Sequence, residues 1–476
     1  MKYVIGIDGG TQSTKVTIFD LEGNIVCKAR QELRPCVAEK PGYVEHPDDD
    51  LWDSLVAASQ KLMSEFEGDK KDILGVGLCT IRCCRAFLKR DGTLAAPIMD
   101  WMDVRAYKPY VFPDEAEYAA TTTGYMTFRL TGQKKDTAAN NIHRQWPIDN
   151  VKWNWSNDED RFEKWNLTRE KLFDLVLPGD VLGHITKEAS EMTGLPEGLP
   201  VVASANDKGV EALGSGLVGV DIGLMSLGTY IPGMVCGKSY MGETKSFYTN
   251  FSSVPGSYLY ECWGIRRGMW TISWFKDLLG KEVKLKAIDL SVSPEELLDM
   301  EAEKIPAGSE GLLTLPEWLM PADFAYKKGI IMGFDGRHGR AHIFRSIMEG
   351  IAMTLKNNFG AMLGELEANM PEKLIVSGGG SNSGTFMQIF SDVFGVPAVR
   401  NVVNEAAGLG AAICAAVATG GHKGYSEAVA AMVKRRDEFM PSAANHKLYT
   451  ELNRAAFSRI SDVNDRIFYN INNVLC

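Results

Sequence analysis

A hydroxyl-rich turn near the start of the chain offers the first place for chemistry. Residues 3–19 read YVIGIDGGTQSTKVTIF, in which an apolar strand ends at Asp8 and a second strand returns after the turn. The Asp-Gly pair is a strong hairpin signal, because both residues accept the backbone angles of a tight turn. Thr11, Gln12 and Ser13 then present side-chain and backbone N–H donors, which can surround phosphate oxygens. The alternative at this point is an ordinary hairpin with a polar loop.

A carboxylate at the end of a later strand is the second candidate. The apolar segment 199–204 runs into ANDKGVEALGSG, where Asn206 and Asp207 stand between the strand and a short helix at 208–213. A carboxylate held rigidly at a strand end can act as a general base, and the adjoining helix N–H groups favour its charge. The alternative is that Asp207 only caps the helix, which is a common use of aspartate.

A turn in the second half repeats the opening hairpin in shorter form. Residues 223–235 read GLMSLGTYIPGMV, which predicts a strand, a turn at Gly228 and Thr229, and a returning strand. The repetition suggests a duplication, with a nucleotide held between two related halves.

A glycine loop farther along the chain is the last candidate for ligand binding. Residues 373–395 predict a strand, a loop containing Gly379 and Gly380, and a helix capped by one of residues 381–383. Consecutive glycines let a purine ring or a phosphate lie directly against the backbone.

The elements that must position these turns alternate between strand and helix. Residues 25–33 and 73–79 are strand-like, and residues 51–67 predict a helix that begins after a run of aspartates. Residues 404–419 predict a helix of small side chains, whose main use is close packing against a neighbour. This alternation indicates an α/β protein.

Composition narrows the classes of protein. The chain has 476 residues, 45% of them hydrophobic and 24% charged, which suits a soluble protein of two or three domains. A net charge of −10 argues against nucleic-acid binding. No apolar run reaches the length of a membrane span and no signal region precedes the first strand, so we expect no membrane attachment and a cytoplasmic location. Nine cysteines, an odd number, fit reduced thiols.

Several weaker patterns do not define a site. His338 and His342 have helical spacing, but no acidic or cysteine partner completes a zinc site in the sequence. Cys79, Cys83 and Cys84 lack a second ligand pair, so buried thiols are expected. GSGLVG at 214–219 follows a helix rather than a strand, and no GxxxxGK[ST] motif occurs, so neither dinucleotide binding of that type nor a Walker-type ATPase is supported.

Taken in order along the chain, the motifs resemble the FGGY carbohydrate kinases of the actin-like ATPase superfamily. The resemblance covers nearly the whole chain. It rests on IGIDGGTQSTK at 5–15, ANDKGVEALGSG at 205–216, SLGTY at 226–230, GIIMGFDGRHGRAHIFRSIME at 329–349 and VSGGGSNSGTFMQIFSDVFG at 376–395.

The resemblance implies a fold of two actin-like, ribonuclease H-like α/β domains that enclose a cleft. Each domain is expected to hold a mixed five-stranded sheet flanked by helices. The N-terminal, sugar-binding domain is placed at 1–217 and the C-terminal, nucleotide-binding domain at 218–476. A homodimer is common in the family.

The resemblance also implies phosphorylation of a hydroxyl on a small sugar or polyol, a ketopentose first of all, with ATP and Mg²⁺. Asp207 matches the general base, and Asp8 matches the carboxylate that organises Mg²⁺. Thr11, Gln12 and Ser13 match the loop at the γ-phosphate. Further matches are Gly228 and Thr229 in the second phosphate loop, Gly379, Gly380 and Ser383 at the nucleotide, and Arg82, Asp103 and Asp207 at the acceptor.

The acceptor side departs from the family pattern. Residues 78–84 read LCTIRCC, and only Arg82 agrees with the Gln-Arg-Glu of glycerol kinases or the Arg-Glu of autoinducer-2 kinases. Only residues 106–112 separate DWMDVR from the following motif, where family members carry several tens of residues. Three hypotheses therefore stand: a ketopentose kinase, an autoinducer-2-like or other polyol kinase, and a nucleotide-binding regulator without sugar-kinase turnover.

Overall fold

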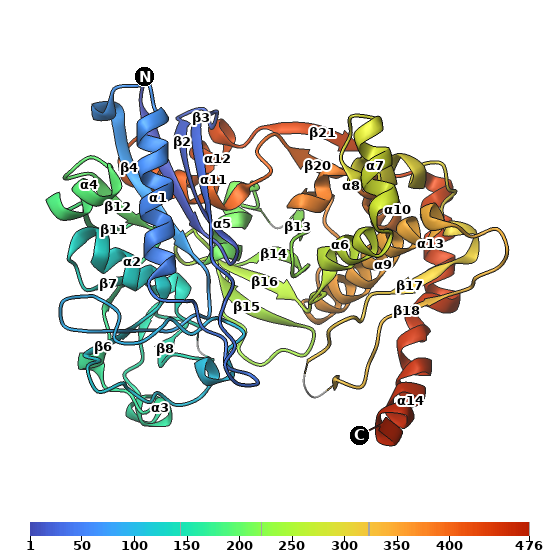
Figure 1. The fold of residues 1–476 in the computed structure, drawn as a ribbon, viewed down its shortest axis with the longest axis horizontal. Coiled ribbons are helices and arrows are strands. Elements are labelled where there is room, and N and C mark those ends of the chain that lie inside the picture. The colour runs from blue at the N-terminus through green and yellow to red at the C-terminus, as the bar shows by residue number, and fades with distance from the viewer. Residues whose placement is uncertain (143, 220, 322–323, 476) are drawn as a thin grey trace.

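Two mixed β-sheets, one in each half of the chain, form the frame of the computed structural model, and helices flank them (Figure 1). The structure describes residues 1–476 apart from 143, 220, 322–323 and 476. The predicted α/β class with two helix-flanked sheets is confirmed.

The first sheet carries the opening hairpin at its centre, in the strand order β11-β12-β4-β1-β2-β3. β1 to β3 form an antiparallel meander, β4 runs parallel to β1, β12 runs parallel to β4, and β11 is an antiparallel edge. The strands are β1 (Tyr3–Gly9), β2 (Ser13–Asp20), β3 (Ile25–Glu32), β4 (Ile73–Thr80), β11 (Val181–His184) and β12 (Pro200–Ala203).

The second sheet repeats this topology, in the order β15-β16-β14-β13-β19-β20-β21. β13, β14 and β16 are antiparallel neighbours, and β19 and β20 continue parallel to β13. The strands are β13 (Ile222–Ser226), β14 (Gly233–Gly237), β15 (Phe247–Phe251), β16 (Tyr258–Cys262), β19 (Lys373–Ser377), β20 (Ala398–Asn401) and β21 (Arg435–Phe439). The repetition noticed in the sequence is thus a repetition of strand pairing.

The predicted five strands per sheet are too few. Within the described residues the sheets have six and seven strands, because β11 joins the first sheet and β15 and β21 join the second. All three lie at sheet edges and pair antiparallel with their neighbours. They form hydrogen bonds with backbone N–H and C=O groups of β12, β16 and β20, which would otherwise be unpaired at the sheet edges.

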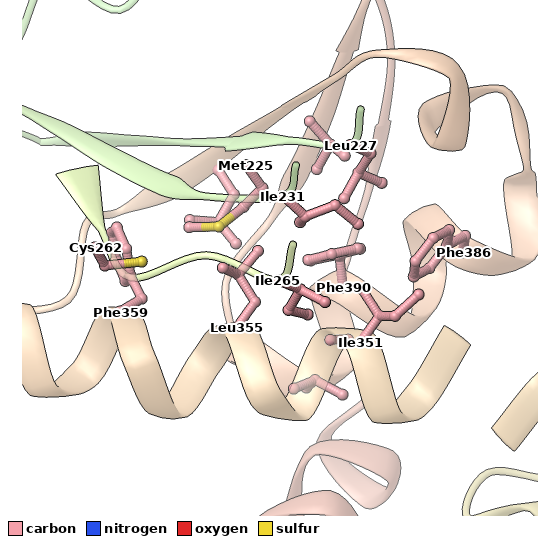
Figure 2. Close-up of a cluster of buried hydrophobic side chains, with 14 of the residues drawn as sticks. Met225, Leu227, Ile231, Cys262, Ile265, Ile351, Leu355, Phe359, Phe386 and Phe390 are labelled. Carbon is pink, nitrogen blue, oxygen red and sulfur yellow. The ribbon is translucent and has the colours of Figure 1, made fainter. Parts of the chain in front are cut away.

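Helices of each half bury one face of their own sheet. In the first half, α1 (Asp50–Glu65), α2 (Thr122–Thr131) and α4 (Lys187–Thr193) contribute to a core with the first sheet. In the second half, α9 (Arg340–Glu365) and α10 (Gly384–Phe394) pack against the strands around the second hairpin. Figure 2 shows Leu227 and Ile231, which flank the Gly228 turn, above Ile351 of α9 and Phe390 of α10. The turn therefore stands on a rigid apolar base.

The remaining elements are short strands and peripheral helices. The strands are β5 (Ala86–Leu88), β6 (Tyr118–Ala120), β7 (Lys135–Thr137), β8 (Ile148–Asp149), β9 (Asn154–Trp155), β10 (Asp174–Val176), β17 (Leu313–Leu315) and β18 (Ile330–Met332). The helices are α3 (Glu159–Trp165), α5 (Asp207–Gly214), α6 (Gly268–Leu278), α7 (Lys281–Asp289), α8 (Pro294–Ala302), α11 (Ala406–Ala418), α12 (Tyr425–Met432), α13 (Ala443–Leu452) and α14 (Ser458–Leu475). No helix in the described ranges is both long and apolar enough to cross a membrane.

The small-residue helix α11 joins the two halves, which confirms the predicted helix and its packing role. A Cβ added at Gly6 of β1 would lie 1.9 Å from the carbonyl oxygen of Gly408, and one at Gly77 of β4 would lie 1.8 Å from that of Ala411. One at Gly214 of α5 would lie 1.9 Å from the carbonyl oxygen of Ala406. Backbone thus meets backbone at these three glycines. The boundary predicted at 217/218 stays a prediction.

We expect Gly6→Ala to weaken this contact severely. Its methyl group occupies the position of a backbone oxygen that cannot turn aside, so the free energy of unfolding should fall by about 3 kcal/mol. Urea unfolding measures the change. Gly408→Ala is the matched control, because a Cβ there meets nothing within 4 Å and alanine favours the helix. Wild-type stability in Gly6→Ala would contradict the packing described.

Candidate active site

The carboxyl ends of the three parallel strands of the first sheet carry the predicted polar residues. Asp8 lies near the end of β1 opposite Cys79 of β4, Arg82 follows β4, and Asp207 follows β12. Parallel strands bring their carboxyl ends to one edge of the sheet, where α/β proteins bind their ligands. The fold therefore gathers residues that are far apart in the sequence.

The first loop keeps two of its predicted donors open. The N–H of Gly10 donates to the carbonyl of Ser13 over 3.1 Å, and the N–H of Leu33 donates to the carbonyl of Gln12 over 2.9 Å. Thr11 and Gln12 are exposed, whereas Ser13 is buried. Thr11 and Gln12 can thus meet a ligand with their side chains.

Asp8 lies in a crowded acidic environment. Burial, aided by the carboxylates of Asp207, Glu405 and Glu211, raises the pKa of Asp8 to about 6 against the opposing charge of Lys15. The Lys15 ammonium lies 3.9 Å from Asp8 and 3.2 Å from Glu405. Asp8 and Asp207 therefore share one electrostatic environment, which an added cation would relieve.

Asp207 begins α5 but does not cap it, so the capping alternative is wrong. Asn206 is the cap, and its side chain accepts the Gly209 N–H over 3.2 Å. One oxygen of Asp207 is buried without a hydrogen-bond partner among the described residues, although Arg82 Nε lies 3.5 Å away. The side chain as a whole is 40% exposed. Asp207 is thus held in place and remains open to a ligand.

Arg82 connects the two halves beside Asp207. Its two terminal nitrogens each donate to an oxygen of Glu261 on β16 over 3.0 Å, and Glu261 is fully buried. Burial lowers the pKa of Arg82, but Glu261, Tyr248 and Asp207 together outweigh this and hold the pKa well above its ordinary value. Glu261 was not predicted, because 179 residues separate it from Arg82. The predicted acceptor contact of Arg82 stays a prediction.

The second loop lies against the helix that carries Asp207. The Lys208 ammonium donates to Ser226 Oγ over 2.7 Å, and Ser226 ends β13 just before the loop. Thr229 is exposed, and a Cβ at Gly228 would have open space on most sides. The loop predicted to bind phosphate is therefore accessible. It is linked to Asp207 through the neighbouring Lys208, which contacts the strand before the loop.

Glu211 also takes part in the contact between α5 and the second sheet, and it was not predicted from the sequence. Its carboxylate accepts from Lys208 over 2.7 Å and from Ser226 over 2.9 Å, and it also accepts from Ser377 at the end of β19. Lys208 and Glu211 are three residues apart on one face of a helix, but only the fold shows that this face meets the second sheet.

The third loop has a mainly structural pattern of contacts. Gly379 is open, because an added Cβ meets nothing within 4 Å, whereas Gly380 packs against Leu227 of the second loop. Ser383 caps α10 by accepting the Phe386 N–H over 2.9 Å, and its hydroxyl donates to Asp299 over 2.5 Å. Ser383 is thus the cap among the three residues considered. Nucleotide binding by this loop stays a prediction.

Asp103 is fully buried and already has partners. Its carboxylate accepts the N–H of Val44 over 2.8 Å and three N–H groups of Arg105 over 2.6 to 3.0 Å. Burial raises the pKa of Asp103, but these Arg105 bonds and the backbone donors lower it below its ordinary value. The structure thus gives Asp103 a positioning role, and its predicted acceptor contact stays a prediction.

The short connection after Arg105 is tightly packed. Tyr110 is fully buried, its ring lies 3.5 Å below the guanidinium of Arg85, and its hydroxyl donates to the Gln145 carbonyl over 3.1 Å. Around it lie Phe87, Trp146 and Trp165. An aromatic core thus packs around the connection formed by residues 106–112.

Solved kinases share this fold of two actin-like domains. The xylulose kinase of Rhodospirillum rubrum superposes with a TM-score of 0.83 at 23% identity, covering 98% of this chain and 100% of that one. A ligand-bound xylulose kinase of Lactobacillus acidophilus gives 0.84 at 19% identity, with 99% and 100% covered. At these identities the similarity establishes the fold alone.

The sequence comparisons identify the family. The FGGY family of carbohydrate kinases matches at 3–111 with its N-terminal domain and at 223–419 with its C-terminal domain. The uncharacterized sugar kinase YgcE of Escherichia coli K12 is 48% identical over 468 residues, covering 98% of this chain and 94% of that protein. The xylulose kinase of Bacillus subtilis is 25% identical, with 98% of each covered. This chain belongs to the FGGY family of carbohydrate kinases and is a phosphotransferase with a hydroxyl acceptor, in a family that uses ATP.

Replacing the crowded carboxylate should stabilise the ligand-free protein. Because folding raises the pKa of Asp8 from 3.8 to about 6, the charged form is disfavoured, and stability from this group falls as pH rises through that range. Asp8→Asn should therefore exceed the wild type by about 3 kcal/mol at pH 7.5 and by only about 1 kcal/mol at pH 4.5. Chemical unfolding at several pH values measures the difference.

Asp114→Asn is the control for this measurement, because Asp114 is exposed on the surface. Its difference from the wild type should be small at every pH. A difference between Asp8→Asn and the wild type that does not change between pH 4.5 and 7.5 would contradict the electrostatic account.

Proposed function

We propose that this sugar kinase transfers the γ-phosphoryl group of Mg·ATP to a ketopentose hydroxyl, with Asp207 as the general base. The observation that carries the proposal is the placement of Asp207. Asp207 starts a helix that lies between the two sheets, its buried Oδ1 faces Arg82 at 3.5 Å, and its side chain as a whole is 40% exposed. Its neighbour Lys208 contacts the strand before the second loop. A carboxylate so held can accept a proton from a hydroxyl in front of it.

The protein's part in such a transfer is mainly alignment. Phosphoryl transfer needs the attacking oxygen and the phosphorus in line, and it needs the charge of the phosphate balanced. Arg82 restricts Asp207 from one side, and Glu261 in turn fixes Arg82 with two parallel hydrogen bonds. When the bond to phosphorus forms, the acceptor hydroxyl loses its proton to Asp207, and ADP leaves with the electrons of the broken bond.

The residues near Asp8 fit a magnesium ion. Mg²⁺ prefers carboxylate oxygens and phosphate oxygens as ligands. Asp8 supplies the carboxylate, and its pKa is raised first by burial and then by the nearby charges of Asp207, Glu405 and Glu211. When bound, the ion neutralises charge on the terminal phosphates. Thr11, Gln12, Gly228 and Thr229 are the loop residues that we assign to those phosphates.

The competing functions are an autoinducer-2-like or other polyol kinase and a nucleotide-binding regulator without turnover. What favours them is that Arg82 and Asp103, the predicted acceptor contacts, already bind Glu261 and Arg105. ADP release with a panel of ketopentoses, alditols and furanones distinguishes the three functions. A regulator would bind ATP without acceptor-dependent release of ADP.

Asp207→Asn should retain the fold and ATP binding but lose turnover by a factor of about 100 to 10,000, because the amide cannot accept the proton. Steady-state ADP release measures turnover, and calorimetry measures ATP binding. Asp289→Asn, at an exposed position on α7, is the control and should match the wild type. Unchanged turnover in Asp207→Asn would exclude the assigned role.

A further inference from the structure

A cluster of sulfur, nitrogen and oxygen ligands lies behind the acceptor side of the site. Cys36 follows β3, His46 precedes α1, and Asp100 precedes the turn that contains Asp103. His46 Nε2 lies 3.2 Å from Asp100 Oδ2, and His46 Nδ1 lies 3.9 Å from Cys36 Sγ. One ligand atom from each of the three residues falls within 4.8 Å of the others.

A second thiol adjoins the same histidine. Cys84 is 1% exposed and interacts with the His46 side chain, and the charge of Asp100 also acts on it. The sequence had suggested that Cys84 is an ordinary buried thiol. The structure instead surrounds His46 with two cysteines and one aspartate, which come from separate segments of the first half.

We propose that Cys36, His46 and Asp100 bind one Zn²⁺ ion, with the neighbouring Cys84 thiol as the fourth ligand once it turns toward the ion. Thiolate, imidazole and carboxylate are the three ligand types that zinc takes in proteins, and four of them complete its tetrahedral shell. Zinc bonds of about 2.0 to 2.3 Å place the ligand atoms about 3.3 to 3.8 Å apart. Asp100 and Cys36 adjoin different nitrogens of His46, only one of which can bind the ion. One ligand atom from each residue nevertheless lies within 4.8 Å of the others, so movements of about 1 Å bring the three atoms to zinc-binding separations.

The protons and charges of this binding step balance. Zinc takes cysteine as the thiolate and histidine as the neutral imidazole. Each bond to the ion therefore displaces the proton, if any, that the ligand atom carries without metal, and that proton passes to solvent. No redox change is involved.

The position of the cluster would let the zinc ion cross-link separate segments of the first half. Cys84 lies two residues after Arg82, and Asp100 lies three residues before Asp103. Nearby, Arg105 already joins Asp103 to Glu45 over 2.6 Å on each side. A zinc ion would tie the segment around His46 to both segments of the acceptor side, where the chain lacks the family's longer connection. The site does not depend on which acceptor the kinase uses.

Metal content tests the proposal. Protein purified with a phosphine reductant and without chelator should contain about one zinc per chain by mass spectrometry. The metal-free protein should bind Co²⁺ with a thiolate-to-cobalt charge-transfer band, and Zn²⁺ should raise its melting temperature. Cys36→Ser, in a partly exposed loop, should fold and should lower zinc affinity at least tenfold.

Cys27→Ser is the matched control, because Cys27 is also partly buried but contacts the Leu62 carbonyl instead. It should retain zinc at the wild-type level. The proposal is overturned if the wild type holds less than a tenth of an equivalent after zinc is supplied, if Cys36→Ser retains wild-type affinity, or if the cobalt complex lacks the thiolate band.

Discussion

The backbone contact of α11 with the first sheet is the constraint on which the rest of the structure depends. Gly6, Gly77 and Gly214 each face a carbonyl oxygen of α11 at a distance that no side chain allows. This contact fixes a helix of the second half on strands of the first and holds α5 between the two sheets (Figure 1). The position of Asp207 follows from it, since Asp207 is the first residue of α5.

The electrostatics of the site are arranged for a bound ligand more than for stability. Asp8, Glu211 and Glu405 bring negative charge together beside Lys15 and Lys208, and burial of Asp8 makes its charged form unfavourable. An acid with a raised pKa costs the ligand-free protein stability at neutral pH. Active sites commonly carry such a cost, because the same charges stabilise the bound state. In the ligand-free protein, the hydrogen bonds among Lys208, Ser226 and Glu211 hold the strand that leads into the second loop.

Local patterns predicted well what local sequence determines. The opening hairpin, the second hairpin, the capping of α10 and the small-residue helix α11 follow from turn residues, alternation and helix caps within one segment. The ion pair of Arg82 with Glu261 does not, because nothing local marks a partner 179 residues away. Asp103 and Ser383 were assigned from family resemblance, which does not show that Arg105 and Asp299 bind them. The edge strands β11, β15 and β21 were missed for the same reason, since their pairing is tertiary.

The contact between Arg82 and Glu261 limits how the two halves can move. Kinases of this kind exclude water by closing domains over the substrates. Here a doubly hydrogen-bonded ion pair joins the halves beside Asp207, and its buried carboxylate would lose its partner if the pair separated. The contact of α11 holds the halves together elsewhere. An opening beside Asp207 would therefore break both hydrogen bonds of Arg82 with Glu261, whereas the exposed Thr11, Gln12 and Thr229 can move without breaking them.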